Sequence, residues 1–395
     1  MTPLSKNSAT LKKIEVADAS FIHAHSWVEL SQANFFHNIR CLKKVVGQGM
    51  LGGVVKGDAY GHGLLQVSWL LEQAVDVAII LVVNVAEALL LRENGISKPI
   101  CVLGYHNGSL EEAIKKDVHL VAYDIHSLRA ILSAAKKVGY PAYIHVKVDT
   151  GMGRLGFLPH EVLLIVAQIL MHDQAKWVGI LSHLSDANNP DISYVHKQAA
   201  VFDKVLDNLQ EKYGVLPPYV HINASGGCAR LESSRYTLTR VGTHMYGYWK
   251  CAQQSMWYAE RGHQFTLRQL MTWKTKIMHL KNIPAGNFIG YECSYRASRA
   301  MQVAVVPVGY ADGYPLRVSQ GTMLLHGVHV PIVGRVSMNY ITLDVTDVPR
   351  VNIGDEVVIL GNYPGITATD IAQIDDTLTL YTLTSINPSL PRVII

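Results

Sequence analysis

Short apolar runs alternate with helical patterns through the first two thirds of the chain. The residues from Val77 to Val83 form a continuous apolar run of strand length, and Asn84 stands where a helix cap belongs. Beyond it, Ala86, Leu89 and Ile96 recur at helical spacing. This pattern predicts a buried strand followed by an amphipathic helix.

Seven similar apolar runs lie at residues 51–56, 100–104, 119–123, 142–149, 177–183, 219–224 and 238–242. About eight such strand–helix units over about 200 residues predict an α/β fold of the TIM (β/α)8 barrel type, with a doubly wound sheet as the alternative. From about Phe265 onward, short alternating segments are punctuated by Gly and Pro, which is typical of a mostly-β domain. The predicted organisation is an N-terminal extension (1–26), a barrel (27–260) and a C-terminal mostly-β domain (261–395), which the strand-like residues 27–31 are free to join.

Composition excludes several classes of protein. Of the 395 residues, 49% are hydrophobic and 17% are charged, which excludes a disordered chain. The net charge of +4 is spread without a basic block, so no nucleic-acid partner is expected. The longest apolar stretch, 75–91, is interrupted by polar residues, so no membrane span is predicted. The first 18 residues lack a sustained apolar segment, so no secretory signal is predicted. Five scattered cysteines without a C-x-x-C pair favour a reducing, cytoplasmic location.

Lys56 is the first candidate for chemistry, because catalytic groups of a barrel gather just past the ends of its strands. It closes the apolar run 53–55 and precedes a flexible turn at 57–63. A lysine that emerges from an apolar strand can have a depressed pKa and form a Schiff base. On position alone, a lysine that merely exits to solvent is the alternative.

Five motifs carry a resemblance to a known family. The segment 54–63, VVKGDAYGHG, resembles the pyridoxal-phosphate lysine motif of alanine racemases. Four further segments match the same family in the same order: 147–156 (KVDTGMGRLG), Tyr291, 308–313 (VGYADG) and 334–338 (GRVSM). The resemblance as a whole covers roughly Trp27 to the C-terminus. The resemblance implies a homodimer that uses pyridoxal 5'-phosphate, with Lys56 holding the cofactor and Tyr60 binding its phosphate. The conjugated ring of this cofactor accepts the electrons left when an α-proton departs.

The ends of the later strands supply the remaining candidates for binding the cofactor. Loops after strands seven and eight of a barrel commonly cradle phosphate, which favours Ser225, Gly242 and Thr243 there. The resemblance places His183 beside the cofactor ring and Arg240 at its pyridine nitrogen. Because a guanidinium only donates hydrogen bonds, that nitrogen is expected to stay unprotonated.

Racemisation removes a proton from one face of the α-carbon and returns one to the other, so two acid–base groups are expected. The resemblance assigns these roles to Lys56 and to Tyr291, the latter supplied across a dimer interface. It assigns the substrate carboxylate to Arg154 and the substrate pocket to Tyr310 and Met338. The same resemblance marks Lys147 as a candidate for carbamylation, and it implies racemisation of alanine, which supplies D-alanine for peptidoglycan.

The chain departs from the family pattern at three places. Asn339 and Ala224 stand where Asp and Asn are usual, and Pro388 stands where the family has a tyrosine that closes the pocket. Losing that ring predicts a looser pocket, so a racemase of broader specificity, taking serine, lysine or arginine, is an alternative function. A decarboxylase of basic amino acids is less favoured, because its C-terminal cysteine would have to be Cys293. A metal-dependent hydrolase would need His23 and His25 as ligands, and no metal site is predicted.

Overall fold

The structure, a computed structural model, describes residues 24–231 and 233–395. Within these residues the chain forms two compact units. We call the first the barrel unit (Phe35–Lys56 and Val67–Arg268) and the second the β unit (24–34, Gly57–Gln66 and Gln269–Ile395). His23 and most of the predicted N-terminal extension lie outside the described residues.

The barrel unit is built on eight parallel strands, as the alternating pattern predicted. Their order around the sheet runs from β8 through β7, β6, β5, β4, β3 and β2 to β9. A parallel bridge between Ala224 and Arg240 joins the two ends, so the sheet closes. The strands are β2 (Met50–Val54), β3 (Val77–Val82), β4 (Ile100–Val102), β5 (Val118–Ala122), β6 (Ala142–Lys147), β7 (Ala175–Leu181), β8 (Tyr219–His221) and β9 (Leu238–Val241).

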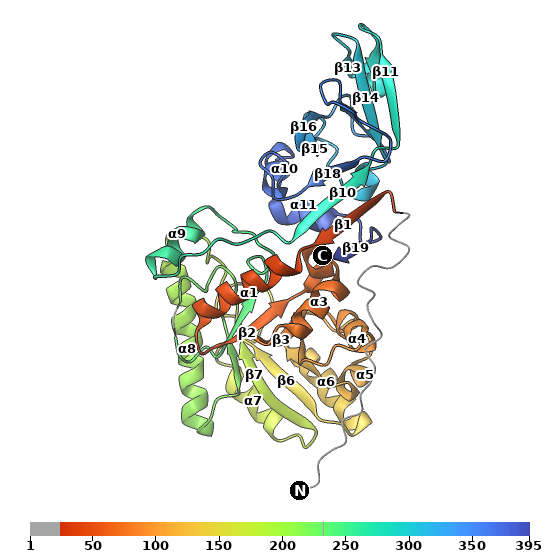
Figure 1. Cartoon of the computed structure of the whole chain (residues 1–395). Coiled ribbons are helices and arrows are strands. Elements are labelled where there is room, and N and C mark those ends of the chain that lie inside the picture. Colours follow the sequence, from red (N-terminus) through yellow and green to blue (C-terminus); the bar gives the residue numbers. More distant parts are fainter. Residues whose placement is uncertain (1–23, 232) are drawn as a thin grey trace. The chain divides into compact units, whose positions relative to one another are not determined.

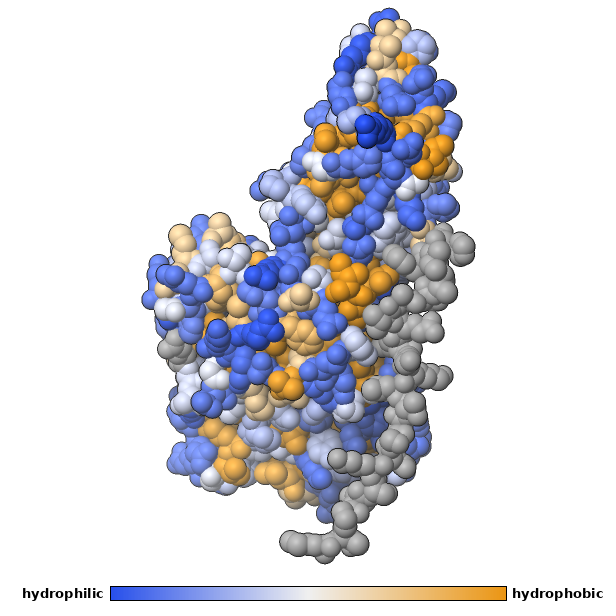
Figure 2. All heavy atoms as spheres, viewed as in Figure 1, coloured by the Kyte–Doolittle hydropathy of each residue, from blue (hydrophilic) through white to orange (hydrophobic). Residues whose placement is uncertain are grey.

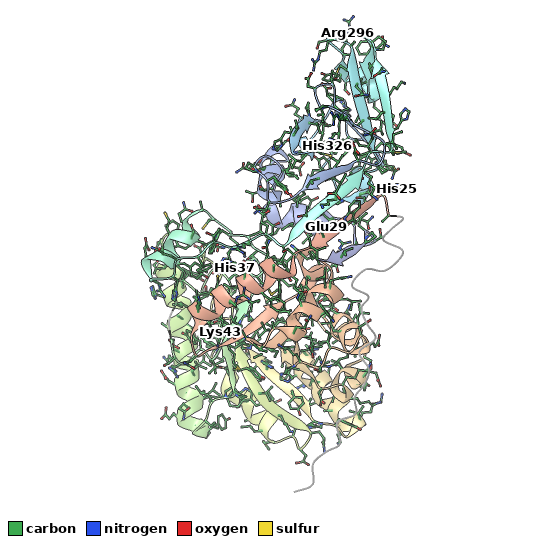
Figure 3. The ribbon with its side chains drawn as sticks, viewed as in Figure 1. His25, Glu29, His37, Lys43, Arg296 and His326 are labelled. Carbon is green, nitrogen blue, oxygen red and sulfur yellow. The ribbon has the colours of Figure 1, made fainter. Side chains whose placement is uncertain are left out.

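Helices cover the outside of these strands (Figure 1). The side chain of Asn84 accepts a hydrogen bond from the backbone N–H of Glu87, so it caps the helix after β3 as predicted. On α1, His37 and Lys43 contact the backbone carbonyls of Thr266 and Gly49 and so hold the helix in place (Figure 3). The helices are α1 (Gln32–Val46), α3 (Leu64–Gln73), α4 (Val85–Glu93), α5 (Leu110–Lys115), α6 (Ile125–Val138), α7 (Val162–Leu170), α8 (Ser193–Tyr213) and α9 (Gln253–Glu260).

The β unit contains a six-stranded sheet in the order β16-β15-β18-β10-β1-β19. In it β1 pairs antiparallel with β10 and parallel with β19, so both ends of the described chain enter one sheet. Lys274 on β10 ties its neighbours together through Glu29 on β1 (2.9 Å; Figure 3) and Glu356 on β18 (2.8 Å). The sheet consists of β1 (Ser26–Leu30), β10 (Met271–Lys276), β15 (Thr322–Leu325), β16 (Val328–Pro331), β18 (Glu356–Leu360) and β19 (Arg392–Ile394).

Smaller elements complete the β unit. Three strands, β11 (His279–Ile283), β14 (Met301–Val306) and β17 (Ile341–Asp344), form a second sheet, and β12 (Phe288–Ile289) pairs with β13 (Tyr295–Arg296). Two short helices, α10 (Ala368–Ile374) and α11 (Thr379–Ser385), follow β18. The predicted class, a TIM barrel followed by a mostly-β domain, is therefore confirmed.

The surface of each unit is mixed. Polar residues predominate on the face shown in Figure 2, and apolar residues lie in scattered groups. Among the described residues, none of the helices is both long enough and apolar enough to span a bilayer.

Candidate active site

The carboxyl ends of the barrel strands gather a group of cations. Lys56 follows β2, Lys147 ends β6, and Arg240 lies on β9. The charges of Arg154 and Arg240 lower the pKa values of both Lys56 and Lys147, as expected of cations that lie near one another. Such a group favours a ligand that carries several negative charges.

Within this group, Arg240 is held by hydrogen bonds inside the barrel. Its side chain is buried, with 4% exposed, and it donates five hydrogen bonds. Nη1 contacts Nδ1 and the carbonyl oxygen of His221, both at 2.9 Å. Nη2 contacts the carbonyl oxygens of Ser182 (2.8 Å) and Ile222 (3.2 Å) and Nδ1 of His183 (3.0 Å). Burial lowers the pKa of Arg240 to about 10, which leaves it charged at neutral pH.

The bond from Arg240 determines the protonation of His183. Because a guanidinium can only donate, Nδ1 of His183 accepts and the ring proton of the neutral imidazole sits on Nε2. Burial, followed by the charges of Arg240 and Arg154, lowers the pKa of His183 to about 2. His183 is therefore a neutral side chain that presents an N–H donor.

Lys56 leaves the barrel through an unusual turn. Gly57, Asp58, Ala59 and Tyr60 all have φ between 52° and 63°, so the short segment α2 (Lys56–Tyr60) is a left-handed turn. Strain of this kind persists where surrounding structure enforces it, and it often marks a functional site. Desolvation lowers the pKa of Lys56, and the charges of Arg154, Lys250 and Arg240 lower it further, although the side chain remains accessible to solvent. The neutral form of the amine is therefore more accessible than it is for an ordinary surface lysine.

Lys147 and Arg154 are the other two members of the cation group. Lys147 is 8% exposed, and burial together with the charges of Arg240 and Arg154 lowers its pKa to about 8. Arg154 follows a tight loop in which Oδ1 of Asp149 accepts the N–H groups of Gly151 (2.9 Å), Met152 (2.8 Å) and Gly153 (3.2 Å). That loop presents Arg154 to solvent at the rim of the barrel.

The predicted phosphate cradle consists of buried small residues. Oγ of Ser225 accepts a hydrogen bond from the backbone N–H of Gly242 at 2.9 Å, which joins the loops after β8 and β9. Ser225 and Thr243 are both buried. Small side chains at this place leave room for an anion beside backbone N–H groups.

The remaining predicted residues lie in the β unit. Tyr291 begins the 3-10 turn Tyr291–Cys293 and is 69% exposed. Tyr310 and Met338 are brought together, because the N–H of Tyr310 contacts the carbonyl oxygen of Ser337 (3.1 Å) and that of Ala311 contacts Met338 (3.0 Å). The rings of Tyr291 and Tyr310 and the side chain of Met338 are all exposed on the β unit, where they are available for contact with another surface.

Tyr60 is also grouped with the β unit, on the segment Gly57–Gln66. Burial raises the pKa of Tyr60 to about 12, so its hydroxyl stays protonated at neutral pH. The neighbouring Arg392 donates to the carbonyl oxygen of Gly61 at 3.1 Å and so anchors this segment to the C-terminal strand.

Sequence reasoning missed several residues around the cation group. His221 supports Arg240 directly, and Lys250 adds a further positive charge near Lys56. The signal for His221 was a polar residue at the end of a short, otherwise mostly apolar strand. Within the described parts of the chain, no group of three or more His, Cys, Asp or Glu side chains is arranged to hold a metal ion.

Comparison with known proteins identifies the family of this architecture. The family model "Alanine racemase, N-terminal domain" matches residues 30–250, and "Alanine racemase, C-terminal domain" matches residues 270–394. An alanine racemase of Syntrophobacter fumaroxidans is 37% identical over 360 residues, covering 90% of this chain and 93% of that protein. Alanine racemase 2 of Caldanaerobacter subterraneus subsp. tengcongensis is 36% identical, covering 93% and 94%. The solved alanine racemase of Clostridium difficile 630 superposes with a TM-score of 0.87 at 30% identity, covering 94% and 96%.

Proposed function

The chain belongs to the alanine racemase family of isomerases, and from that premise we propose that it interconverts L-alanine and D-alanine with pyridoxal 5'-phosphate as its cofactor. One observation carries the proposal most directly. Lys56, whose pKa is lowered, follows the barrel strand β2 within a group of cations that suits a phosphorylated ligand. The D-alanine formed would serve peptidoglycan synthesis in the cytoplasm.

The donors in the barrel fit the chemistry of this cofactor. A neutral amine at Lys56 can bind an aldehyde covalently, and the lowered pKa makes that form more available at neutral pH. In the cradle of Ser225, Gly242 and Thr243, the hydroxyls of Ser225 and Thr243 offer donors for a phosphate, while the N–H of Gly242 is already bound to Oγ of Ser225. We assign the protonated hydroxyl of Tyr60 to the same phosphate. When bound, the cofactor supplies a conjugated ring that accepts the electrons released from the α-carbon.

Arg240 and His183 define the electrostatics beside the ring. Arg240 is a buried donor that keeps its charge, so a ring nitrogen that faces it would accept a hydrogen bond and remain unprotonated. By keeping the ring nitrogen unprotonated, Arg240 would make the bound cofactor a weaker electron acceptor and so would limit transamination as a side reaction. His183 stays neutral next to it.

Two groups would move the α-proton. Lys56 serves one face of the α-carbon, and we assign the opposite face to Tyr291 of a second subunit, because its ring is exposed on the β unit. Arg154 would bind the substrate carboxylate through its planar pair of donors. Lys147, if carbamylated, would place a negative charge near Arg154 and Arg240.

Proton exchange tests substrate and reaction type together. We expect the purified protein to turn yellow with pyridoxal 5'-phosphate and then to exchange the α-proton of L-alanine for deuterium while D-alanine accumulates. Lys56→Ala should stay colourless and inactive. A colourless wild-type protein, or carbon dioxide release from L-lysine or L-ornithine in place of racemisation, would contradict the proposal.

Mixing two inactive variants tests whether subunits share sites. In a hybrid dimer of Lys56→Ala and Tyr291→Phe chains, a shared arrangement creates one intact site out of two. Random exchange of subunits then restores up to about a quarter of wild-type activity, because about half of the dimers are hybrid. No recovery after verified exchange would place both residues of a site in one chain.

A broader substrate range is favoured by one specific observation. Pro388 is exposed in the segment after α11, where the N–H of the adjacent Asn387 contacts the carbonyl oxygen of Asp312 at 3.0 Å. That places the segment next to the turn that carries Tyr310. Comparison of kcat/KM for L-alanine, L-serine, L-lysine and L-arginine tests it, with Pro388→Tyr as the variant expected to favour alanine. A strong preference for alanine in the wild type would exclude the broader function.

A further inference from the structure

Three buried histidines form a hydrogen-bonded series that begins at Arg240. Nη1 of Arg240 lies 2.9 Å from Nδ1 of His221. Nε2 of His221 lies 3.2 Å from Nδ1 of His145, and Nε2 of His145 lies 3.0 Å from Nδ1 of His119. All three imidazoles are buried inside the barrel unit, and His145 and His221 have no exposed surface. The proposed function uses neither His145 nor His119.

A glycine makes the series sterically feasible. His145 is on β6 and His221 is on β8, so their contact must pass over the intervening strand β7. Gly179 on β7 is the backbone partner of His145, and a Cβ atom there would lie 2.0 Å from Nδ1 of His145. The missing side chain therefore provides the space in which the two rings meet.

The chemistry of arginine sets the direction of every bond in the series. A guanidinium cannot accept, so Nδ1 of His221 must be unprotonated and, in a neutral ring, Nε2 carries the proton. The N–H of His221 then requires Nδ1 of His145 to accept, and the same argument passes to His119. We propose that Arg240 holds His221, His145 and His119 as neutral Nε2–H tautomers whose aligned dipoles replace a carboxylate as the partner of this buried cation.

The surroundings of Arg240 support this role. Among the described residues, no Asp or Glu forms a hydrogen bond or ion pair with its guanidinium. A buried charge without compensating polar groups would be costly. Each Nε2–H imidazole directs its electron-rich Nδ1 toward Arg240, which stabilises the cation. Burial together with the charge of Arg240 lowers the pKa values of His221 and His145, so these rings stay neutral.

Imidazole dipoles and a carboxylate differ in how much of the positive charge of Arg240 they leave to act on its other neighbours. A carboxylate would neutralise Arg240, whereas neutral rings stabilise its charge without cancelling it. The positive charge then remains effective on the side of Nη2, which contacts His183 at 3.0 Å. His145 and His119 are thus positioning residues that act through Arg240. The effect on a cofactor ring rests on the proposed function, but the tautomers do not, and the test below uses the protein without added cofactor.

Nitrogen-15 NMR of histidine-labelled protein reads the tautomers directly. We expect pyridine-type Nδ1 and protonated Nε2 signals for all three rings of the wild type, assigned by their loss in the variants His119→Gln, His145→Gln and His221→Gln. A proton on Nδ1 of any of the three, or an imidazolium at neutral pH, would refute the proposal whether or not the protein is a racemase.

Paired variants at residue 145 test the link to the site. A glutamine can accept from His221 and donate to His119, so His145→Gln should leave the Nδ1 signal of His183 unchanged, whereas His145→Leu should move it toward the value of a free imidazole. Gly179→Ala, which keeps every histidine, should act like His145→Leu. A His183 signal that is the same in all these proteins would show that the series does not act through Arg240, and equal shifts in the Gln and Leu variants would show a merely structural role.

Discussion

Arg392 anchors the segment that carries Tyr60, and its removal should have a large and measurable effect. The side chain of Arg392 is 3% exposed, and its guanidinium donates to four backbone carbonyl oxygens in the β unit. Nη1 contacts Asn387 (2.7 Å) and Leu390 (2.6 Å), and Nη2 contacts Gly61 (3.1 Å) and Ile386 (3.4 Å). Replacement by methionine keeps much of the apolar stem and removes all of these donors.

The expected cost of Arg392→Met follows from these contacts. Three of the four bonds are short enough to count fully, and each charged hydrogen bond contributes about 1.5 kcal/mol or more. The substitution also removes Nε, a buried donor without a partner among the described residues, whose absence returns about 1 to 2 kcal/mol. The net loss in the free energy of unfolding is about 3 kcal/mol, equivalent to a fall in Tm of roughly 6 to 12 °C for a unit of this size.

Urea unfolding followed by circular dichroism measures the loss, and absorbance titration measures affinity for pyridoxal 5'-phosphate. We expect Arg392→Met to weaken cofactor binding as well, because Gly61 follows Tyr60 directly. The matched control is Arg299→Met, since Arg299 and Asp347 form an ion pair with side chains 53% and 76% exposed. Such a pair contributes about 0 to 1 kcal/mol. If Arg392→Met lay within the range of the control, the anchoring argument would be wrong.

Three further predictions follow from local geometry and charge. Gly61→Ala should destabilise the protein by about 1 to 3 kcal/mol more than Gly139→Ala, because both have positive φ but only at Gly61 does a Cβ meet a backbone oxygen, 2.0 Å away on Leu383; equal losses in urea unfolding would contradict this. Buried neutral histidines have folded pKa values below the unfolded value, so the unfolded chain binds more protons, and stability should fall by up to about 1.4 kcal/mol per pH unit for each of them as pH falls from about 6.5 to 4. The histidines concerned are His119, His183 and His244. If the urea midpoint stayed constant over that pH range, these three side chains would not be neutral in the folded protein. Carbon-13 bicarbonate should give a carbamate NMR signal that grows as pH rises through about 8, where Lys147 loses its proton, and Lys147→Arg should abolish it.

The repeating pattern of the chain predicted the barrel, with a doubly wound sheet as the alternative. Continuous apolar runs such as Val77–Val83 indicate strands that are buried on both faces of their sheet. Such strands are typical of a parallel sheet whose faces are covered by helices. Asn84 marked the start of a helix because capping depends on nearby residues alone. Lys56 could be singled out because it follows a predicted strand, and the carboxyl ends of the strands in a barrel share one rim where catalytic groups gather.

Other features depend on residues that are far apart in the sequence. The sequence left residues 27–31 free to join the C-terminal domain but did not specify which strands they pair with. In the structure, β1 pairs with both β10 and β19, which joins positions separated by more than 200 residues. The left-handed turn after Lys56 is visible only as a glycine-rich segment in the sequence, although Asp58, Ala59 and Tyr60 adopt the same conformation. Their strain is tolerated because surrounding structure holds them.

The electrostatic state of the site was also beyond the reach of the sequence. Local composition identified Lys56 and, through the family motifs, Arg240 and His183 as the residues to consider. Only the closed barrel brings His221, His145 and His119 into line with Arg240 across the space left by Gly179. The physical reason is that residue type and spacing determine local conformation and burial, whereas pKa values and hydrogen-bond direction depend on distances that exist only after the strands have closed around one core.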